Sequence, residues 1–172
     1  MEQNVSMKIN ELPSPTWNWL KVNETPIKWS NKIEPCEIAA EGDVVATETE
    51  QLSDIETGAG READAIFATE NTAKYQILAD NAGQDKTVRL HISGKKDAHM
   101  AGSVEIVVKE NSTLTVVMDS RVAPDATKEE DSTAEASLAV RVRMKVESGA
   151  SVRLIQVQMP QEHETLLSDI GG

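Results

Sequence analysis

Apolar and polar residues alternate along two stretches of the chain that share one layout, Val104–Ser120 and Val142–Gln158. Alternation with a period of two is typical of a β-strand with one buried face and one exposed face. In each stretch, two alternating segments flank a short polar turn. The apolar positions coincide: Val104 with Val142, Ile106 with Met144, Val108 with Val146, Leu114 with Val152, and Val116 with Leu154. A repeated unit of this kind cannot bury its apolar face alone, so the pattern favours stacked β-structure.

The turns of the two copies also correspond. Glu110–Ser112 in the first copy matches Ser148–Ala150 in the second. At their centres lie Asn111 and Gly149, residue types that tolerate the left-handed backbone of a tight turn. Two copies do not identify one fold, however, because any two hairpins of an all-β domain can look this similar. The pattern alone therefore leaves a sandwich, a closed barrel and a β-helix open.

A third strand, turn, strand unit precedes these two copies. Its apolar residues alternate on both sides of the loop Asp80–Lys86; they are Tyr75, Ile77, Ala79, Val88, Leu90 and Ile92. No helix long enough for a βαβ crossover separates the three units, which argues against a doubly wound fold. The sequence therefore predicts an all-β fold, with an N-terminal region over residues 1–73 and a β core over residues 74–172.

The N-terminal region divides into an arm and a connector. Lys8–Trp29 holds three of the six prolines, which favours an extended arm over a long helix. We expect this arm to dock its tryptophans onto the body of the protein; they are Trp17, Trp19 and Trp29. Glu34–Asp64 is rich in Glu, Asp, Thr and Gly, and its shortage of apolar residues predicts a loosely held acidic connection. A short helix is predicted over Arg61–Ala68.

The composition and net charge of the chain limit the classes of partner that it can bind. The 172 residues are enough for one domain, and aromatic residues make up only 3% of them, so Val, Ile, Leu and Ala must build the core. The net charge of -12 argues against nucleic acid and anionic membrane as partners. Neither a run of membrane-spanning length nor a signal-peptide layout is present, which predicts a cytoplasmic protein. Ala123–Ala136 is acidic and predicts a solvated loop.

The search for metal or nucleophile chemistry assigns no catalytic, cofactor-binding or metal-binding residue. The histidines are His91, His99 and His163, and no two of them have His-x-His or His-x-x-x-His spacing. We expect His91 and His163 at the surface. Cys36 has no base beside it in the sequence, so a structural or surface cysteine is the expected role.

Other motifs of enzymes are also incomplete. Gly58-Ala59-Gly60 lacks the third glycine and the preceding strand of a dinucleotide site, so we expect a turn there. The chain has no Gly-x-Ser-x-Gly elbow. Carboxylate pairs such as Glu129-Glu130 are expected on a solvated face, since the chain is acidic throughout. The sequence therefore predicts a protein that is not an enzyme.

Three segments together resemble the SufB/SufD family of iron–sulfur cluster assembly proteins, on the SufD-like side. They are LPSPTWNWLKVN (Leu12–Asn23), DIETGAGREAD (Asp54–Asp64) and VRLIQVQ (Val152–Gln158). Within them, Glu56–Glu62 is similar to the family's glycine-containing connector and Gln158 to its strand-terminal glutamine. The family's N-terminal docking motif is matched by Trp17, Leu20, Val22 and Asn23.

The resemblance implies a right-handed, parallel β-helix-like stack with a Trp-rich N-terminal arm. It also implies a non-catalytic scaffold subunit of iron–sulfur cluster assembly, working with a SufB-like subunit and a SufC-like ATPase of the ABC type. The cluster would be handled transiently by the complex, with no cofactor bound by this chain alone. No metal ligand is carried over, because the repeat region contains no cysteine and Cys36 does not match one.

The chain departs from the family in length. Family members are typically much longer, and their C-terminal helical region, which docks the ATPase, has no counterpart here. We therefore expect a short or truncated member, with the ATPase the less secure of its two partners and a homodimer as a further form of pairing. The alternative is a small all-β ligand-binding or carbohydrate-binding domain, although the scarcity of aromatic residues counts against carbohydrate.

Overall fold

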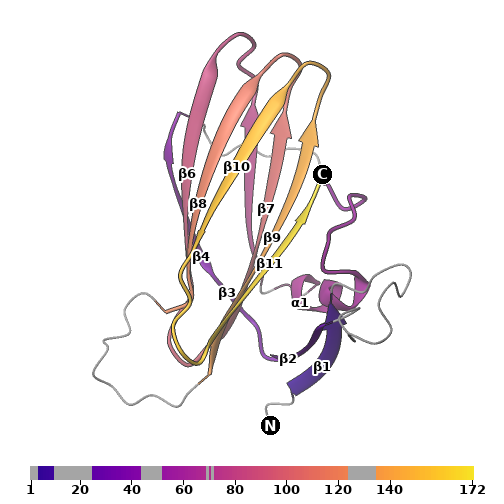
Figure 1. The fold of residues 1–172 in the computed structure, drawn as a ribbon, viewed down its shortest axis with the longest axis vertical. Helices are drawn as coiled ribbons and strands as arrows, with labels where there is room; N and C mark the ends of the chain where they lie inside the picture. The colour runs from indigo at the N-terminus through magenta and orange to yellow at the C-terminus, as the bar shows by residue number, and fades with distance from the viewer. Residues whose placement is uncertain (1–3, 10–24, 44–51, 69, 71, 124–134) are drawn as a thin grey trace, which may run out of the picture.

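The structure, a computed structural model, describes residues 4–9, 25–43, 52–68, 70, 72–123 and 135–172 (Figure 1). These residues form β-strands and one short helical segment, so the predicted all-β class is confirmed. The strands are β1 (Asn4–Ile9), β2 (Thr25–Ser30), β3 (Glu34–Pro35), β4 (Glu37–Gly42), β5 (Ala73–Ala79), β6 (Asp85–Ser93), β7 (His99–Val108), β8 (Thr113–Arg121), β9 (Ala136–Val146), β10 (Ser151–Gln158) and β11 (Glu164–Gly171).

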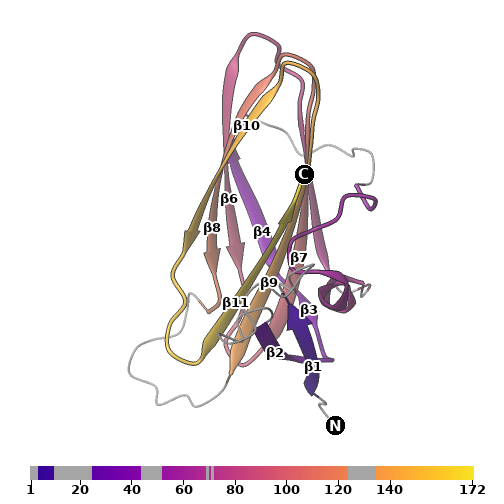
Figure 2. The ribbon, with the colours of Figure 1, turned by 45° about the vertical axis from the view of Figure 1, so that its right-hand side comes forward.

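From β5 onward, successive strands alternate between two sheets that face each other (Figure 2). We call them sheet I, made of β3, β5, β7, β9 and β11, and sheet II, made of β4, β6, β8 and β10. Every neighbouring pair within the two sheets is parallel except β4 and β6, which are antiparallel. β1 and β2 form a separate antiparallel pair.

The strand register stacks the repeated sequence positions on one another. Val104 lies beside Val142 in sheet I, and Leu114 lies beside Val152 in sheet II. The third unit continues the same rows, with Tyr75 beside Val104. The correspondence found in the sequence is therefore a physical one, since matching residues are lateral neighbours in parallel strands.

The turns at one end of the two sheets stack in the same way. Gly83, Asn111 and Gly149 have φ angles of 76°, 56° and 68°, values in the left-handed region that glycine and asparagine tolerate best. The Gly83 amide donates to the Asn111 carbonyl, and the Asn111 amide donates to the Ser148 carbonyl, both at 3.2 Å. The two predicted tight turns are thus confirmed, and a third matches them.

The main core lies between the sheets and is built from branched aliphatic and methionine side chains. The most deeply buried of these are Ile77, Val88, Leu90, Ile92, Met100, Val104, Ile106, Val108, Leu114, Val116, Met118, Leu138, Val140 and Val142. Two strands begin earlier than the repeat predicted, β7 at His99 and β9 at Ala136. After His99, their first residues are small or apolar on both faces, and Ala101 and Ala139 pack in the second cluster on the outer side. Alternation of polarity, the signal on which the prediction relied, is absent there.

A second, smaller core forms on the outer face of sheet I, where β1, β2 and the helical segment pack (Figure 1). The helical segment consists of η1 (Arg61–Ala63) and α1 (Asp64–Phe67), which confirms the predicted short helix. Trp29 is buried in this core, as predicted. Trp17 and Trp19 lie outside the described residues, as does most of the predicted acidic loop, at residues 124–134.

The prediction of a loosely held connection over Glu34–Asp64 is wrong for its first part. β3 pairs with β7, and β4 pairs with β6 over six residues. Cys36 is buried in the main core, and Ile38 and Ala40 pack against it, so this segment does carry an alternating apolar face. Glu34, Glu37 and Glu41, beside and between these positions, give the segment a polar composition, which concealed the strand in the sequence.

Candidate functional site

Two rows of mostly polar residues cross the outer face of sheet I. The parallel register places Lys74, Ser103, Arg141 and Asp169 in one row, and Gln76, Glu105, Arg143 and Gly171 in the next. In β7 and β9 they alternate with the side chains of the main core, so they point the opposite way. The segment 52–67 lies over these rows and is joined to them by several hydrogen bonds and an ion pair.

Arg141 and Asp169 form a buried ion pair in the first row. Arg141 Nε donates to Asp169 Oδ2 at 2.8 Å, and the two residues are 3% and 1% exposed. Asp169 also accepts hydrogen bonds from Thr57 Oγ1 at 2.6 Å and from the Ala59 amide at 2.8 Å. The buried carboxyl group therefore has three hydrogen-bond donors, one of them a guanidinium group. The pair therefore fastens the glycine-containing turn to the sheet.

Arg141 also contacts the helical segment. Its Nη2 atom lies 2.8 Å from Asp64 Oδ1, as an ion pair without hydrogen-bond alignment. Its guanidinium carbon lies 4.1 Å from the centroid of the Phe67 ring, within the range of a cation–π contact. One side chain thus joins β9, β11 and α1, and the role of Arg141 is to position this segment.

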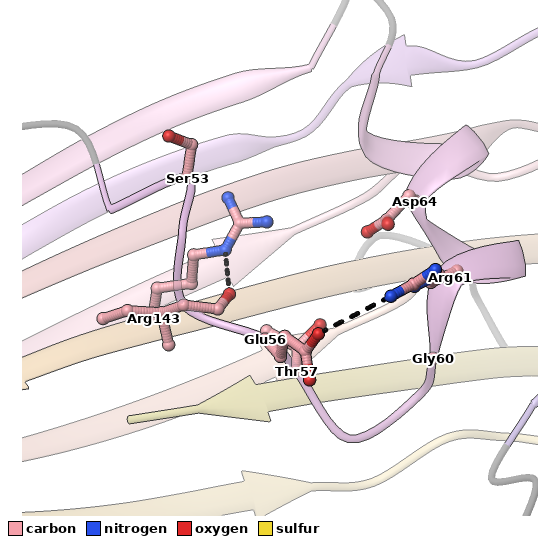
Figure 3. A pocket seen from close by; sticks show the side chains of 8 residues that line it. Ser53, Glu56, Thr57, Gly60, Arg61, Asp64 and Arg143 are labelled. Atoms are coloured by element: carbon pink, nitrogen blue, oxygen red, sulfur yellow. Dashed lines mark hydrogen bonds and ion pairs between the residues drawn. The ribbon is translucent and has the colours of Figure 1, made fainter.

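Arg143, in the second row, borders a cavity of about 300 Å³ that opens to solvent. Its Nε donates to the Ile55 carbonyl at 3.1 Å, which leaves its terminal nitrogens directed into the space between Ser53 and Asp64 (Figure 3). We call this cavity the Arg143 pocket; its lining residues are Ser53, Ile55, Glu56, Thr57, Gly60, Arg61, Asp64 and Arg143.

A second cavity, of about 170 Å³, shares Ser53 and Arg143 with the first. Glu105 borders it and accepts hydrogen bonds from the Leu52 amide at 3.4 Å and from Gln76 Nε2 at 2.8 Å. The Arg143 pocket is mostly polar, the second cavity is mixed because Phe67 and Tyr75 line it, and guanidinium groups line each of them. This arrangement can bind an anion or a polar peptide group, whereas it lacks the apolar walls of a pocket for a large hydrophobic ligand.

Sequence reasoning singled out only one side of this site. Glu56–Glu62, matched to the family's connector, forms the outer wall, and Gly58-Ala59-Gly60 forms the expected turn. Arg141, Arg143 and Asp169 were missed. Two arginines two residues apart in the strongly apolar β9 were the available signal, because such a spacing places both on one face of a strand.

The remaining sequence candidates are scattered. Gln158, matched to the strand-terminal glutamine, is exposed at the end of β10 beside Ser120. Trp17, Leu20, Val22 and Asn23 lie outside the described residues, as do Glu129 and Glu130. The described part of the chain does not bring these candidates together into a site.

Cys36 and the histidines are also apart from one another. Burial raises the pKa of the Cys36 thiol to about 12, which keeps it protonated and unreactive at neutral pH. His91 is half-exposed near Glu41, His163 is exposed in a turn, and His99 Nδ1 lies 2.6 Å from Ser137 Oγ. Among the described residues, no three His, Cys, Asp or Glu side chains are grouped closely enough to hold a metal ion.

Comparisons of the chain with protein-family models, with curated proteins and with solved structures gave no match. In the part of the chain that the structure describes, no helix has the length and apolar character needed to cross a membrane. The function must therefore be argued from the residues and their arrangement.

Proposed function

We propose that this protein is a non-catalytic scaffold subunit of iron–sulfur cluster assembly that pairs with a SufB-like subunit. The proposal rests on the resemblance of the three segments to the SufB/SufD family. The strand order supports it, because strands that alternate between two facing parallel sheets are what the coils of a β-helix would produce. The right-handed sense of that β-helix is part of the proposal, as is a cytoplasmic location.

The observation that carries the pairing is the apolar, open end of the two sheets. β10 and β11 each have one neighbouring strand among the described residues. The exposed large apolar side chains of the described chain all lie on β9, on β10 or directly after it: Val146, Ile155, Val157 and Met159. Edge strands with unpaired backbone groups and apolar side chains are suited to pairing with another chain.

A cluster would be built mainly on the partner in this proposal. Cys36 is buried and its thiol is protonated at neutral pH, so it is unsuited to hold iron. We expect the purified chain to stay colourless after anaerobic reconstitution with iron and sulfide. A stable visible chromophore that disappears in Cys36→Ala would contradict this part of the proposal.

Co-purification tests the pairing. The tagged chain, co-expressed with a SufB-like subunit and its ATPase, is expected to elute with at least the SufB-like subunit on size exclusion at micromolar concentration. Ile155→Lys combined with Val157→Lys should separate the two, because two charges would enter the apolar end. Thr87→Lys, on the exposed face of β6, is the matched control and should leave pairing intact. Separation of the wild-type proteins would count against the scaffold function.

The ATPase and a homodimer are subsidiary parts of the proposal. The helical segment of the described chain is limited to Arg61–Phe67, so support for ATPase docking rests on the family resemblance. A homodimer would use the same apolar end, and the elution volume of the chain by itself reports it.

The alternative function is that of a small all-β ligand-binding domain. The Arg143 pocket favours it, since a polar cavity with guanidinium groups suits an anionic ligand better than a sugar. Carbohydrate sites usually contain aromatic platforms, and the aromatic residues beside the two cavities are Phe67 and Tyr75. A ligand-binding domain would remain unpaired in the co-purification experiment.

A further inference from the structure

We propose that the Arg143 pocket binds a small anion through carboxylate or phosphate oxygens. This inference does not depend on the proposed scaffold function, since the pocket lies on the outer face of sheet I and the exposed apolar side chains lie at the end of β9, on β10 and directly after β10. Arg143 at the floor and Arg61 at the rim would hold the anion between them.

The orientation of Arg143 is fixed in advance. Its Nε–H bond to the Ile55 carbonyl holds the guanidinium plane, and the two Nη atoms point into the cavity (Figure 3). No described residue bonds these Nη atoms. A planar pair of N–H donors held in this way matches the two oxygens of a carboxylate or phosphate group, and little side-chain entropy remains to be lost on binding.

Arg61 supplies a second cation that is free to move. It is 94% exposed, and its Nη2 atom lies 4.0 Å from Glu56 Oε1, whose side chain is 92% exposed. An ion pair this long and this exposed is weak and screened by salt, so an anion can compete for the guanidinium. Arg61 can therefore close over a ligand that Arg143 already holds.

Two carboxylates, those of Glu56 and Asp64, line the pocket beside its two arginines. Asp64 Oδ1 lies 2.8 Å from Arg141 Nη2, and the exposed Glu56 has the long contact with Arg61. Among the described residues no carboxylate lies within ion-pair distance of Arg143, so its charge is available to a ligand. An anion therefore suits the pocket better than a cation does.

The size of the cavity and the net charge of the chain determine how strongly we expect an anion to bind. The cavity of about 300 Å³ is larger than one phosphate ion and can take a small organic anion. The chain carries a net charge of -12, so its overall field opposes anions and binding must rely on short-range contacts. We expect binding in the millimolar to high-micromolar range, weakened by salt.

Titration of the full chain with sodium citrate and, separately, with sodium phosphate tests the inference. Ionic strength is held constant with sodium chloride, and binding is followed by amide chemical shifts. Saturable shifts are expected in Ser53–Asp64 and β9, and citrate should bind more tightly because it fills more of the cavity. If citrate saturates the shifts and phosphate does not, the pocket is a carboxylate site. If phosphate also saturates them, the pocket is a phosphate site as well.

Three variants make the test specific. Arg143→Gln should weaken binding about tenfold or more, because it removes a charge-assisted, two-point contact. Arg61→Gln should weaken it several-fold; this side chain is exposed, so the fold is not at risk. Arg153→Gln, on the exposed face of β10, should leave binding unchanged. Shifts that never saturate, or equal affinity in Arg61→Gln, Arg153→Gln and wild type, would overturn the proposal.

Discussion

The packing around a single glycine shows how closely the N-terminal strands fit the main core. Gly102 faces the interior from β7, and a methyl group there would collide with Cys36 Sγ and lie 3.2 Å from Ile38 Cδ1. The φ angle of Gly102 is not in the left-handed region, so space, and not backbone conformation, requires a glycine. Gly102 thereby allows the side chains of Cys36 and Ile38 to pack close against β7.

Replacement of Gly102 by alanine is therefore expected to destabilise the protein by about 1–3 kcal/mol through overpacking. In the Cys36→Ala background the colliding sulfur is absent, so the same replacement should lower the free energy of unfolding less. Chemical denaturation of the four proteins in a double-mutant cycle measures this coupling. Gly58→Ala is the control, because its nearest neighbour would be at an ordinary contact distance of 3.6 Å. Strictly additive effects would contradict the predicted collision.

The buried thiol of Cys36 also predicts a dependence of stability on alkaline pH. Its pKa is raised from 9.0 to about 12, mainly by burial, so between these values the folded state keeps a proton that the unfolded state loses. The contribution of this thiol to the free energy of unfolding is therefore fully present below pH 9 and decreases as the pH rises toward 12. The stability difference between wild type and Cys36→Ala should narrow by about 1.4 kcal/mol between pH 8 and pH 10. A difference that stays constant would show that the thiol ionises freely in the folded state.

At the scale of elements, the segment 52–67 depends on the sheet it covers for its position. It contains few residues in regular structure, and its contacts run to Arg141 in β9 and Asp169 in β11, far along the chain; Thr57 and Asp169 are separated by 112 residues. Such long-range pairing explains why the sequence predicted the short helix and the turn but not the site. Local sequence patterns predict where a helix or turn lies. Which side chains of the sheet it covers can be stated only when the register of the strands is known.

Asp169→Asn is expected to destabilise this arrangement strongly. The change leaves the Arg141 charge buried with a weaker partner, and breaking a buried ion pair by altering one member costs about 3–5 kcal/mol. Limited proteolysis should then cleave within 52–67 at protease concentrations that leave the wild type intact. Asp119→Asn is the matched control: a hydrogen bond from Arg121 holds the pKa of Asp119 below its usual range, but that pair is partly exposed to solvent, unlike the buried Arg141–Asp169 pair, and contributes less. Equal protease resistance of the two variants would contradict the fastening role of Asp169.

At the scale of the whole molecule, burial changes from one end of the stack to the other. The inner positions of β7 and β8 are fully buried, whereas those of β10 are half-exposed and include Gln156. Gln156 Nε2 donates to Ser168 Oγ at 2.7 Å, which places a polar pair between the two sheets near β11. The sequence predicted the stacking order, because equivalent positions repeat. It did not predict this gradient, because burial depends on how many neighbouring strands a given strand has.

The gradient predicts that the same change, leucine to alanine at an inner position, differs in cost between strands. Leu114→Ala removes a fully buried side chain between strands on both sides and should destabilise by about 2–5 kcal/mol, whereas Leu154→Ala, half-exposed on β10, should cost about 1 kcal/mol. Amide hydrogen exchange should follow the same order, with slow exchange in β7 and β8 and faster exchange in β10 and β11, because parts of a stack open from their least supported end. Equal losses, together with uniform protection across the strands, would mean that the two sheets unfold as one cooperative unit. Such cooperativity would also weaken the case for β10 as a surface that a partner completes, since an edge already as stable as the centre has less to gain from pairing.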